Sequence, residues 1–344
     1  ANPGEFTMRA FLNGKMALSQ AEAVADLIAS ESKKAHEIAL NQLRGNFSSE
    51  LKELREELIH FASLVELELD FAEEDVEFAD RTELLALVTH VNQVVTRLEQ
   101  SFELGNAIKN GVPVAIVGAP NTGKSTLLNQ LLQEDRAIVS NIAGTTRDVI
   151  EETLNIDGIV FRLIDTAGIR DNAEEIEAMG IERSKQKIEQ AKLVLCMADL
   201  SQAESLEEVR LWKTELTDKY PSKKVILVAN KSDLNTQTLA SDEIGISAKA
   251  GSNIEALKDW MVSQITQGAD LQNETIISNI RHRDALTRTR EALTQAQTGL
   301  ETNITGDFVA MDIRQAMYHL GTITGNISED DLLANIFSKF CIGK

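Results

Sequence analysis

The stretch of this sequence best suited to chemistry is GAPNTGKS, residues 118–125. It fits the pattern G-x-x-x-x-G-K-[ST] and lies between an apolar run, VPVAIVG, and a helical run, TLLNQLL. In such a loop, Gly118 and Gly123 let the backbone wrap around phosphates, while amides and a helix N-terminus supply positive potential. Lys124 would neutralise the β- and γ-phosphates, and Ser125 would offer a hydroxyl to Mg²⁺. The spacing therefore predicts a nucleotide-phosphate site.

Three further motifs identify the nucleotide. DTAG, at 165–168, follows a predicted strand, which places Asp165 near the metal and the Gly168 amide near the γ-phosphate. NKSD, at 230–233, ends another strand, and SAK, at 247–249, follows the next. The carboxylate of Asp233 can accept hydrogen bonds from both N1-H and the 2-amino group of guanine, which adenine cannot match. The sequence therefore predicts binding of GTP rather than ATP.

The residue after DTAG is Ile169, where Ras-like switches carry a glutamine that orients water. An apolar side chain cannot position water, so either hydrolysis is very slow or the polar group comes from elsewhere. The acidic stretch immediately downstream offers Glu174, Glu175 and Glu177 for this task.

Composition sets the class of protein. With 344 residues, 43% of them hydrophobic and 26% charged, the chain is expected to be soluble and to form two domains. It has no apolar run near the ~20 residues that a membrane span needs, and no basic-then-apolar leader, so a cytoplasmic location is expected. The two cysteines make neither a disulfide framework nor a zinc pattern. The net charge of -20 disfavours binding of nucleic acid by bulk electrostatics.

Apolar residues recur at helical spacing in the first part of the chain, at 16–108. A first helix is expected from a capping box of Ser19 and Glu22 to a stop near Gly45. A second helix would run to about Phe71, and a third would end at Gly105. The acidic run between these two helices is expected to be a solvated loop.

The period changes at 109–268, where short β-branched or Leu-rich runs alternate with helical stretches. That alternation predicts a mainly parallel sheet covered on both faces. Helical texture returns at 269–344. The expected fold is a helical bundle domain interrupted by an inserted α/β domain, a Ras-like P-loop GTPase domain. The buried-type apolar setting of Cys196 marks it as a core residue.

Together, the P-loop with Asn121, the switch NIAGTTRD (141–148), DTAGIR, NKSD, the flanking helices and the terminal CIGK resemble the MnmE (TrmE) family of tRNA-modification GTPases, over essentially the whole chain. The GTPase motifs are shared with Era- and Der-like GTPases, whereas the flanking helices and CIGK discriminate. The resemblance implies a potassium-activated GTPase that acts with an FAD-dependent MnmG-type partner on C5 of the wobble uridine of certain tRNAs. Hydrolysis would drive dimerisation of the G domains. The alternative is an Era/Der-like switch in ribosome assembly.

The resemblance also assigns roles to residues. Thr146 would complete the Mg²⁺ site with Ser125, and Asp165 would reach that ion through water. Glu177 would be the catalytic glutamate, orienting the attacking water through a second water. The implied potassium ligands are Asn121, Thr145 and the backbone carbonyls of Ser140 and Ile142. The nucleotide-binding residues are Asn121, Thr122, Gly123, Lys124, Ser125, Thr126, Ser140, Asn141, Ile142, Ala143, Gly144, Thr145, Thr146, Asp165, Thr166, Ala167, Gly168, Asn230, Lys231, Ser232, Asp233, Ser247, Ala248 and Lys249.

Both ends of the chain resemble parts of the family that handle folate. Residues 1–15 would be the last strand and linker of an N-terminal folate-binding domain that also forms a constitutive dimer, with most of that domain lying upstream. Lys15 and Lys344 would contact the folate, a 5-formyl- or methylene-tetrahydrofolate. Cys341 is a candidate in one-carbon transfer or in handling the uridine adduct, because Gly343 permits close approach and Lys344 would favour the thiolate. A free tail is the competing interpretation.

The acidic charge suggests that tRNA is held mostly by the partner. The one concentrated basic stretch, IRHRDALTRTR at 280–290, is either a partner or tRNA contact or a solvated helix face.

Overall fold

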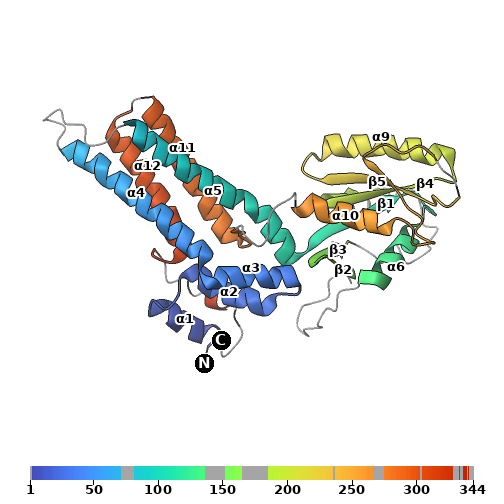
Figure 1. Ribbon diagram of the computed structural model, residues 1–344, viewed down its shortest axis with the longest axis horizontal. Helices are drawn as coiled ribbons and strands as arrows, with labels where there is room; N and C mark the ends of the chain where they lie inside the picture. The colour runs from blue at the N-terminus through green and yellow to red at the C-terminus, as the bar shows by residue number, and fades with distance from the viewer. Residues whose placement is uncertain are drawn as a thin grey trace. The chain divides into compact units, whose positions relative to one another are not determined.

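The computed structural model (Figure 1) describes residues 2–70, 81–135, 152–164, 185–234, 237–266, 275–302, 304–327, 333, 336–338 and 340. The chain divides into two compact units. The first joins Ala1–Lys109 to Asp270–Lys344, and the second is Asn110–Ala269. The predicted fold class is confirmed, because the first unit is helical and the second contains a mostly parallel sheet.

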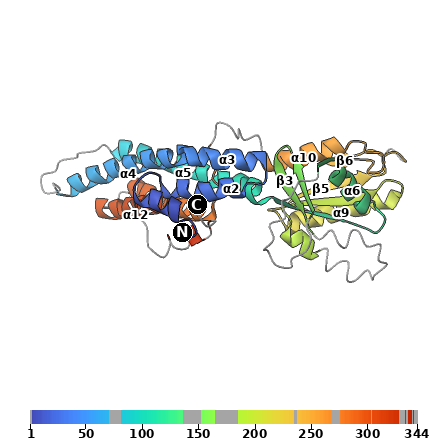
Figure 2. The same ribbon diagram turned by 90° about the horizontal axis from the view of Figure 1, so that it is seen from below.

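The first unit, here called the helical unit, is a bundle of long helices. Figure 1 shows α4, α5, α11 and α12 running beside one another, and Figure 2 shows α4, α5 and α12 from another side. Their inward faces share one apolar core that includes Phe61, Val95, Leu293 and Ile313, one from each helix. The helices of this unit are α1 (Glu5–Leu12), α2 (Leu18–Ala29), α3 (Lys33–Arg44), α4 (Asn46–Asp70), α5 (Arg81–Asn110), α11 (Ile280–Glu301) and α12 (Gly306–Thr324).

The N-terminal segment differs from the sequence expectation. Residues expected to form a strand and linker instead form α1, whose Met8 and Phe11 pack against a small apolar cluster with Leu18 and Phe337. Gly4 precedes the helix with φ of 65°, and a Cβ there would lie 2.8 Å from the carbonyl oxygen of Phe337. The amphipathic spacing of EFTMRAFL therefore serves packing onto the start of α2 and the C-terminal segment.

The expected capping box at Ser19 and Glu22 is wrong. Helix α2 begins at Leu18, and the Oε1 atom of Gln20 accepts a hydrogen bond from the Ala17 amide at 2.8 Å. The predicted stop at Gly45 is confirmed, since this residue caps α3 in the left-handed conformation with φ of 92°. Glu22 caps no helix end, and its side chain is buried inside the helical unit.

Glu22 is buried and joins three helices. Its carboxylate accepts hydrogen bonds from Arg281 at 2.6 and 2.9 Å, and from Asn279 at 3.1 Å, and it lies 2.7 Å from Nε2 of His282. Arg281 also donates to the carbonyl of Thr322 near the end of α12. Burial alone would raise the pKa of Glu22, but the contacts with His282 and Arg281 outweigh burial and lower it to about 2. The ionised carboxylate thus ties α2 to the start of α11 and the end of α12.

The basic stretch at 280–290 is largely engaged within the helical unit. Besides Arg281, Arg290 donates to Glu99 at 2.6 Å and Arg283 contacts both Asp284 and the ring of Phe102. Arg281, Arg283 and Arg290 therefore make contacts within the helical unit, while Arg288 is exposed.

The expected end of the third helix at Gly105 is wrong. Helix α5 continues to Asn110. A Cβ on Gly105 would lie 2.0 Å from the carbonyl oxygen of Ile277 and 2.8 Å from its carbonyl carbon. The glycine therefore allows the backbone that leads into α11 to cross α5 at close range, and it is a packing residue rather than a helix stop.

We expect Gly105→Ala to destabilise the helical unit. Helix propensity alone would favour alanine by about 1 kcal/mol, but the backbone clash reverses the sign, with a net loss of about 1–3 kcal/mol. The measurement is the denaturant midpoint of the helical signal. Gln100→Ala, at an exposed position of the same helix, is the matched control and should change stability little. A more stable Gly105→Ala protein would contradict this account of the crossing.

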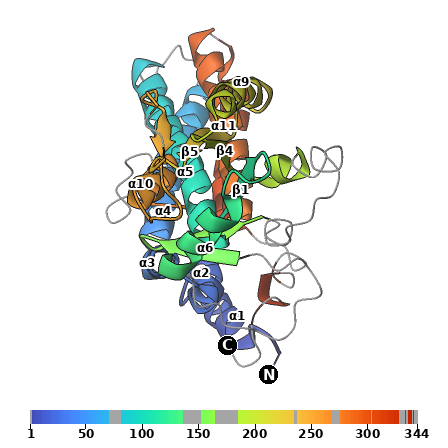
Figure 3. The same ribbon diagram turned by 90° about the vertical axis from the view of Figure 1, so that its right-hand side faces the viewer.

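The second unit, here called the sheet unit, is built on a six-stranded sheet in the order β2-β3-β1-β4-β5-β6. All neighbouring pairs are parallel except β2 with β3. Helix α9 covers one face, where Leu206 and Leu216 pack on Val117 and Cys196. Figure 1 shows α10 on the opposite face, and Figure 3 shows α6 beside the β2–β3 edge. The elements are β1 (Val112–Gly118), α6 (Lys124–Asp135), β2 (Glu152–Ile156), β3 (Ile159–Leu163), β4 (Leu193–Asp199), α9 (Ala203–Lys219), β5 (Lys224–Asn230), β6 (Glu243–Gly245) and α10 (Ile254–Thr266).

Cys196 confirms its predicted place in the core. It lies in β4 with no exposed surface, and burial raises the pKa of its thiol to about 12. Such a thiol stays protonated and unreactive at neutral pH. In the described ranges, no helix combines the length and apolar character that crossing a bilayer requires.

Candidate functional site

The predicted phosphate loop links the end of β1 to the start of α6. Three of its residues have positive φ: 152° at Gly118, 62° at Asn121 and 96° at Gly123. A Cβ on Gly118 would lie 2.6 Å from the carbonyl oxygen of Met197, and one on Gly123 would lie 2.1 Å from Nδ2 of Asn230. The two glycines are therefore required both by backbone conformation and by space.

Lys124 stands at the first position of α6 and folds back over the loop. Its ammonium donates hydrogen bonds to the carbonyl oxygens of Gly118 at 2.9 Å and Ala119 at 2.8 Å. Burial lowers the pKa of Lys124, and the nearby charge of Lys187 adds to the effect. A partly desolvated cation directed at the loop is the group that phosphate oxygens would bind.

Asn230 connects three of the predicted motifs. Its Nδ2 donates to the carbonyl of Thr122 at 2.8 Å, and its Oδ1 accepts from the amide of Ala248 at 2.9 Å. The side chain is buried, so these bonds are shielded from water. The last residue of β5 thus holds the phosphate loop and the SAK segment together at the carboxyl edge of the sheet, where ligands of open α/β sheets bind.

The residues after Asn230 form the predicted guanine-reading segment. Lys231 has a left-handed backbone, with φ of 65°, and the amide of Ser232 donates to the carbonyl of Ile246 at 3.0 Å. Asp233 is exposed, as is Lys249. Ser247 is buried and pairs with Ser252 through two backbone hydrogen bonds. The turn therefore presents Asp233 beside a fixed SAK loop.

Asp199 is a member of this site that the sequence motifs did not indicate. It is the last residue of β4, opposite Asn230 in the parallel register. Its carboxylate binds Lys231 at 2.6 Å and accepts from the hydroxyl and amide of Ser201 at 2.6 and 3.0 Å. Burial alone would raise the pKa of Asp199, but these hydrogen bonds outweigh burial and lower it. The signal available in the sequence was only that LVLCMAD ends in an acid at the edge where the motifs gather.

Comparisons with known proteins decide the family. The sequence profile described as the MnmE helical domain matches residues 18–341. A protein named tRNA modification GTPase MnmE, from Cytophaga hutchinsonii, is 53% identical over 100% of this chain and 75% of its own length. A protein of the same name from Bacteroides fragilis is 52% identical over 100% of this chain and 77% of its own length. The chain belongs to the MnmE family of tRNA modification GTPases.

Solved structures of Era also share sequence with the MnmE-family chain. A variant of Aquifex aeolicus Era bound to GDP and AlF4- is 27% identical over 53% of this chain and 66% of its own, with a TM-score of 0.31.

Part of the site that the MnmE resemblance implies falls outside the described residues, so those roles stay predictions. The residues concerned are Ser140, Asn141, Ile142, Ala143, Gly144, Thr145, Thr146, Asp165, Thr166, Ala167, Gly168, Glu174, Glu175, Glu177, Cys341 and Lys344.

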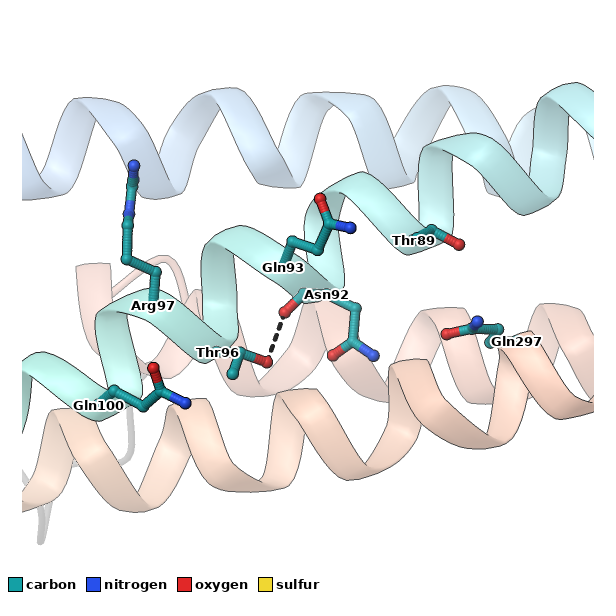
Figure 4. Close-up of a pocket in the computed structure, with 7 residues that line it drawn as sticks. All are labelled: Thr89, Asn92, Gln93, Thr96, Arg97, Gln100 and Gln297. Carbon is teal, nitrogen blue, oxygen red and sulfur yellow. Dashed lines mark hydrogen bonds between the residues drawn. The ribbon is translucent and has the colours of Figure 1, made fainter.

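Two other features of this MnmE-family chain lie in the helical unit. Lys15 is exposed just after α1, and its amide donates to the carbonyl of Ala10 at 2.9 Å. A shallow groove of about 290 Å³ lies between α5 and α11 (Figure 4). Ordinary solvated faces of two helices supply its amides and hydroxyls, and none of the predicted site residues lines it. The lining residues are Thr89, Asn92, Gln93, Thr96, Arg97, Gln100 and Gln297.

Proposed function

We propose that the protein is a potassium-activated GTPase that works in the cytoplasm with an FAD-dependent MnmG-type partner to modify C5 of the wobble uridine of certain tRNAs. Membership of the MnmE family supports the pathway. The observation in this chain that carries the GTPase assignment is the Asn230 bridge, since it brings the phosphate loop and the guanine-reading segments to one edge of the sheet.

The described loop fits a guanine nucleotide with Mg²⁺. The two glycines let the loop pack closely on Met197 and Asn230 with the backbone conformation that wraps phosphates, and the ammonium of Lys124 lies against the loop. Ser125 would hold Mg²⁺ together with Thr146, and Asp165 would hold it through water. When bound, the ion would supply positive charge to phosphate oxygens.

Asn121 fits a role toward a second cation, potassium. It is exposed in the loop, and its left-handed backbone is one that asparagine tolerates better than most residues. We propose that its amide oxygen binds K⁺ with Thr145 and the carbonyls of Ser140 and Ile142. The ion would supply transition-state charge in the position of an arginine finger when two G domains meet as a homodimer.

The net charge of -20 would repel the phosphates of tRNA, so we propose that the partner protein binds most of the tRNA. Folate would be held by a further domain, with Lys15 and Lys344 as contacts from this chain. The described C-terminal residues support the proximity of the chain ends, because Phe337 and Phe340 pack in the same cluster as Met8 and Phe11. This cluster places the segment that precedes Cys341 near the segment that precedes Lys15.

Base selectivity gives a direct prediction. Asp233→Asn should shift binding from GTP toward xanthosine triphosphate, because an amide can donate to the 2-oxo group of xanthine where a carboxylate accepts from guanine. Loss of a charged hydrogen bond should weaken GTP binding by roughly tenfold to hundredfold. Fluorescent-nucleotide titration measures both affinities. Unchanged GTP binding would remove Asp233 from the base site.

The pathway assignment is tested with the full-length protein in cells that lack its gene. Wild type should restore the modified wobble nucleoside in bulk tRNA, as measured by mass spectrometry of digested tRNA. Cys341→Ser should leave potassium-stimulated GTP hydrolysis intact and fail to restore the nucleoside. Normal nucleoside in that variant would make the tail a free end, and a change only in ribosomal subunit profiles on loss of the gene would overturn the pathway.

A further inference from the structure

The contact between Lys231 and Asp199 suggests how the guanine-reading carboxylate is kept available. Lys231 lies two residues before Asp233 in a tight turn, and the backbone amide of Leu234 bonds the carbonyl of Lys231 at 3.0 Å. A lysine so close in sequence to an exposed carboxylate is a natural ion-pair partner for it. Such a pair would occupy the oxygens that must accept hydrogen bonds from the base.

The structure instead gives Lys231 a different partner. Its ammonium lies 2.6 Å from Oδ2 of Asp199, whose side chain is only 3% exposed. The other oxygen of Asp199 is fixed by Ser201, and the Asp199 amide donates to the hydroxyl of Ser205 at 3.0 Å. Among the described residues, the carboxylate of Asp233 has no hydrogen-bond or ion-pair partner.

We infer that Asp199 is a specificity-determining positioning residue: by holding the Lys231 ammonium, it keeps the Asp233 carboxylate free to read the base edge of a guanine nucleotide. This inference rests on the proposed binding of guanine nucleotides. Asp199 acts through Lys231 and touches no nucleotide itself. The contact between Asp199 and Lys231 follows from the parallel register of β4 and β5. This register places Asp199 opposite Asn230, and therefore beside Lys231.

The geometry favours this role over a purely structural one. The turn after β4 is already held without Lys231, because Ser201 donates twice to Oδ1 of Asp199 and the Ser205 hydroxyl accepts from the Asp199 amide. The bond to Lys231 adds a charged partner from another segment, and the lysine side chain is still 32% exposed. Because its ammonium is bound to Asp199 while the side chain as a whole stays partly exposed, the direction of Lys231 is set by this contact rather than by close packing.

The test compares Asp199→Asn with wild type for affinity toward GDP and inosine diphosphate. Inosine lacks the 2-amino group, so the ratio of the two affinities reports on the hydrogen bond from that group to Asp233. A charged hydrogen bond is worth roughly tenfold to hundredfold in affinity, and wild type should prefer GDP by that factor. In Asp199→Asn the ratio should fall toward unity as Lys231 turns to Asp233. The amide oxygen of the substituted side chain would still accept from Ser201, which limits damage to the fold.

A second variant removes the competing cation. In Asp199→Asn combined with Lys231→Met, Asp233 has no ammonium beside it, so the ratio should return to the wild-type value. Lys231→Met alone removes a residue of the proposed nucleotide site, so it should lower the affinities for GDP and inosine diphosphate alike and leave their ratio as in wild type. Asp259→Asn, at an exposed position of α10, is the matched control for loss of one negative charge in the same unit.

The outcomes separate this inference from the proposed function. A lowered ratio restored by Lys231→Met supports the role of Asp199. Equal losses of GDP and inosine diphosphate affinity, with the ratio unchanged, would show that Asp199 only stabilises the fold and would overturn it. A lowered ratio that Lys231→Met does not restore would also overturn it. A wild-type protein without preference for guanine would instead defeat the proposed function.

Discussion

Potassium is expected to raise GTP hydrolysis by a factor of about 10³ to 10⁵ over sodium at matched ionic strength, the range that an arginine finger supplies. The expectation rests on the proposed ligand set around Asn121. Carbonyl and amide oxygens form a neutral site whose size suits the larger ion, and a cation there stabilises charge that develops on the transferred phosphoryl group. Initial rates of phosphate release in KCl and NaCl measure the effect.

Asn121→Ala supplies the control for the potassium prediction. The variant should lose the stimulation and keep its affinity for GDP, because the amide of Asn121 makes none of the hydrogen bonds that hold the loop to Asn230. Rubidium, with a radius close to that of potassium, should also activate. Equal rates in KCl and NaCl would contradict the proposal, and an arginine finger would then be sought at Arg147 or Arg170, which lie outside the described residues.

The GTPase fold could be predicted from sequence because its signals are local. The run VPVAIVG, the glycines at 118 and 123 and the helical run after them each describe one segment, and the loop geometry follows from their order. The NKSD motif likewise ends a strand, as expected. What the motifs could not show is that a single side chain, Asn230, bonds to both of the other segments.

The errors of prediction share a cause, which is that tertiary contacts assign a role different from the local one. Glu22 has the spacing of a capping residue, but its carboxylate instead lies against the guanidinium of Arg281 and the ring of His282, more than 250 positions away. Gly105 reads as a helix stop, and its actual role depends on the backbone of Ile277. Asp199 meets Lys231 only through strand register. None of these partners can be read from a window of sequence.

The proposed catalytic glutamate offers a sharp test of the family resemblance. Ile169 cannot orient water, and three acids follow it, of which the resemblance selects Glu177. Alanine variants at Glu174 and Glu175 are matched controls, since each removes one carboxylate from the same acidic stretch. If the residue-by-residue alignment with the family is right, these two variants should hydrolyse GTP at nearly the wild-type rate in KCl.

Glu177→Ala should retain GTP binding while its rate of hydrolysis in KCl falls by about 10² to 10⁴, the range for loss of a residue that handles a proton or orients the attacking water. Binding should survive because the substitution leaves Lys124 and Asn230 unchanged, and these residues are the ones proposed to bind the phosphates and to hold the phosphate loop. Single-turnover hydrolysis with GTP bound in advance separates the chemical step from affinity. Glu177→Gln should recover part of the rate if the residue orients water and none if it must accept the proton. A sensitive Glu174 or Glu175 with an unaffected Glu177 would show that the residue-by-residue alignment is shifted, whereas three unaffected variants would remove this stretch from the mechanism.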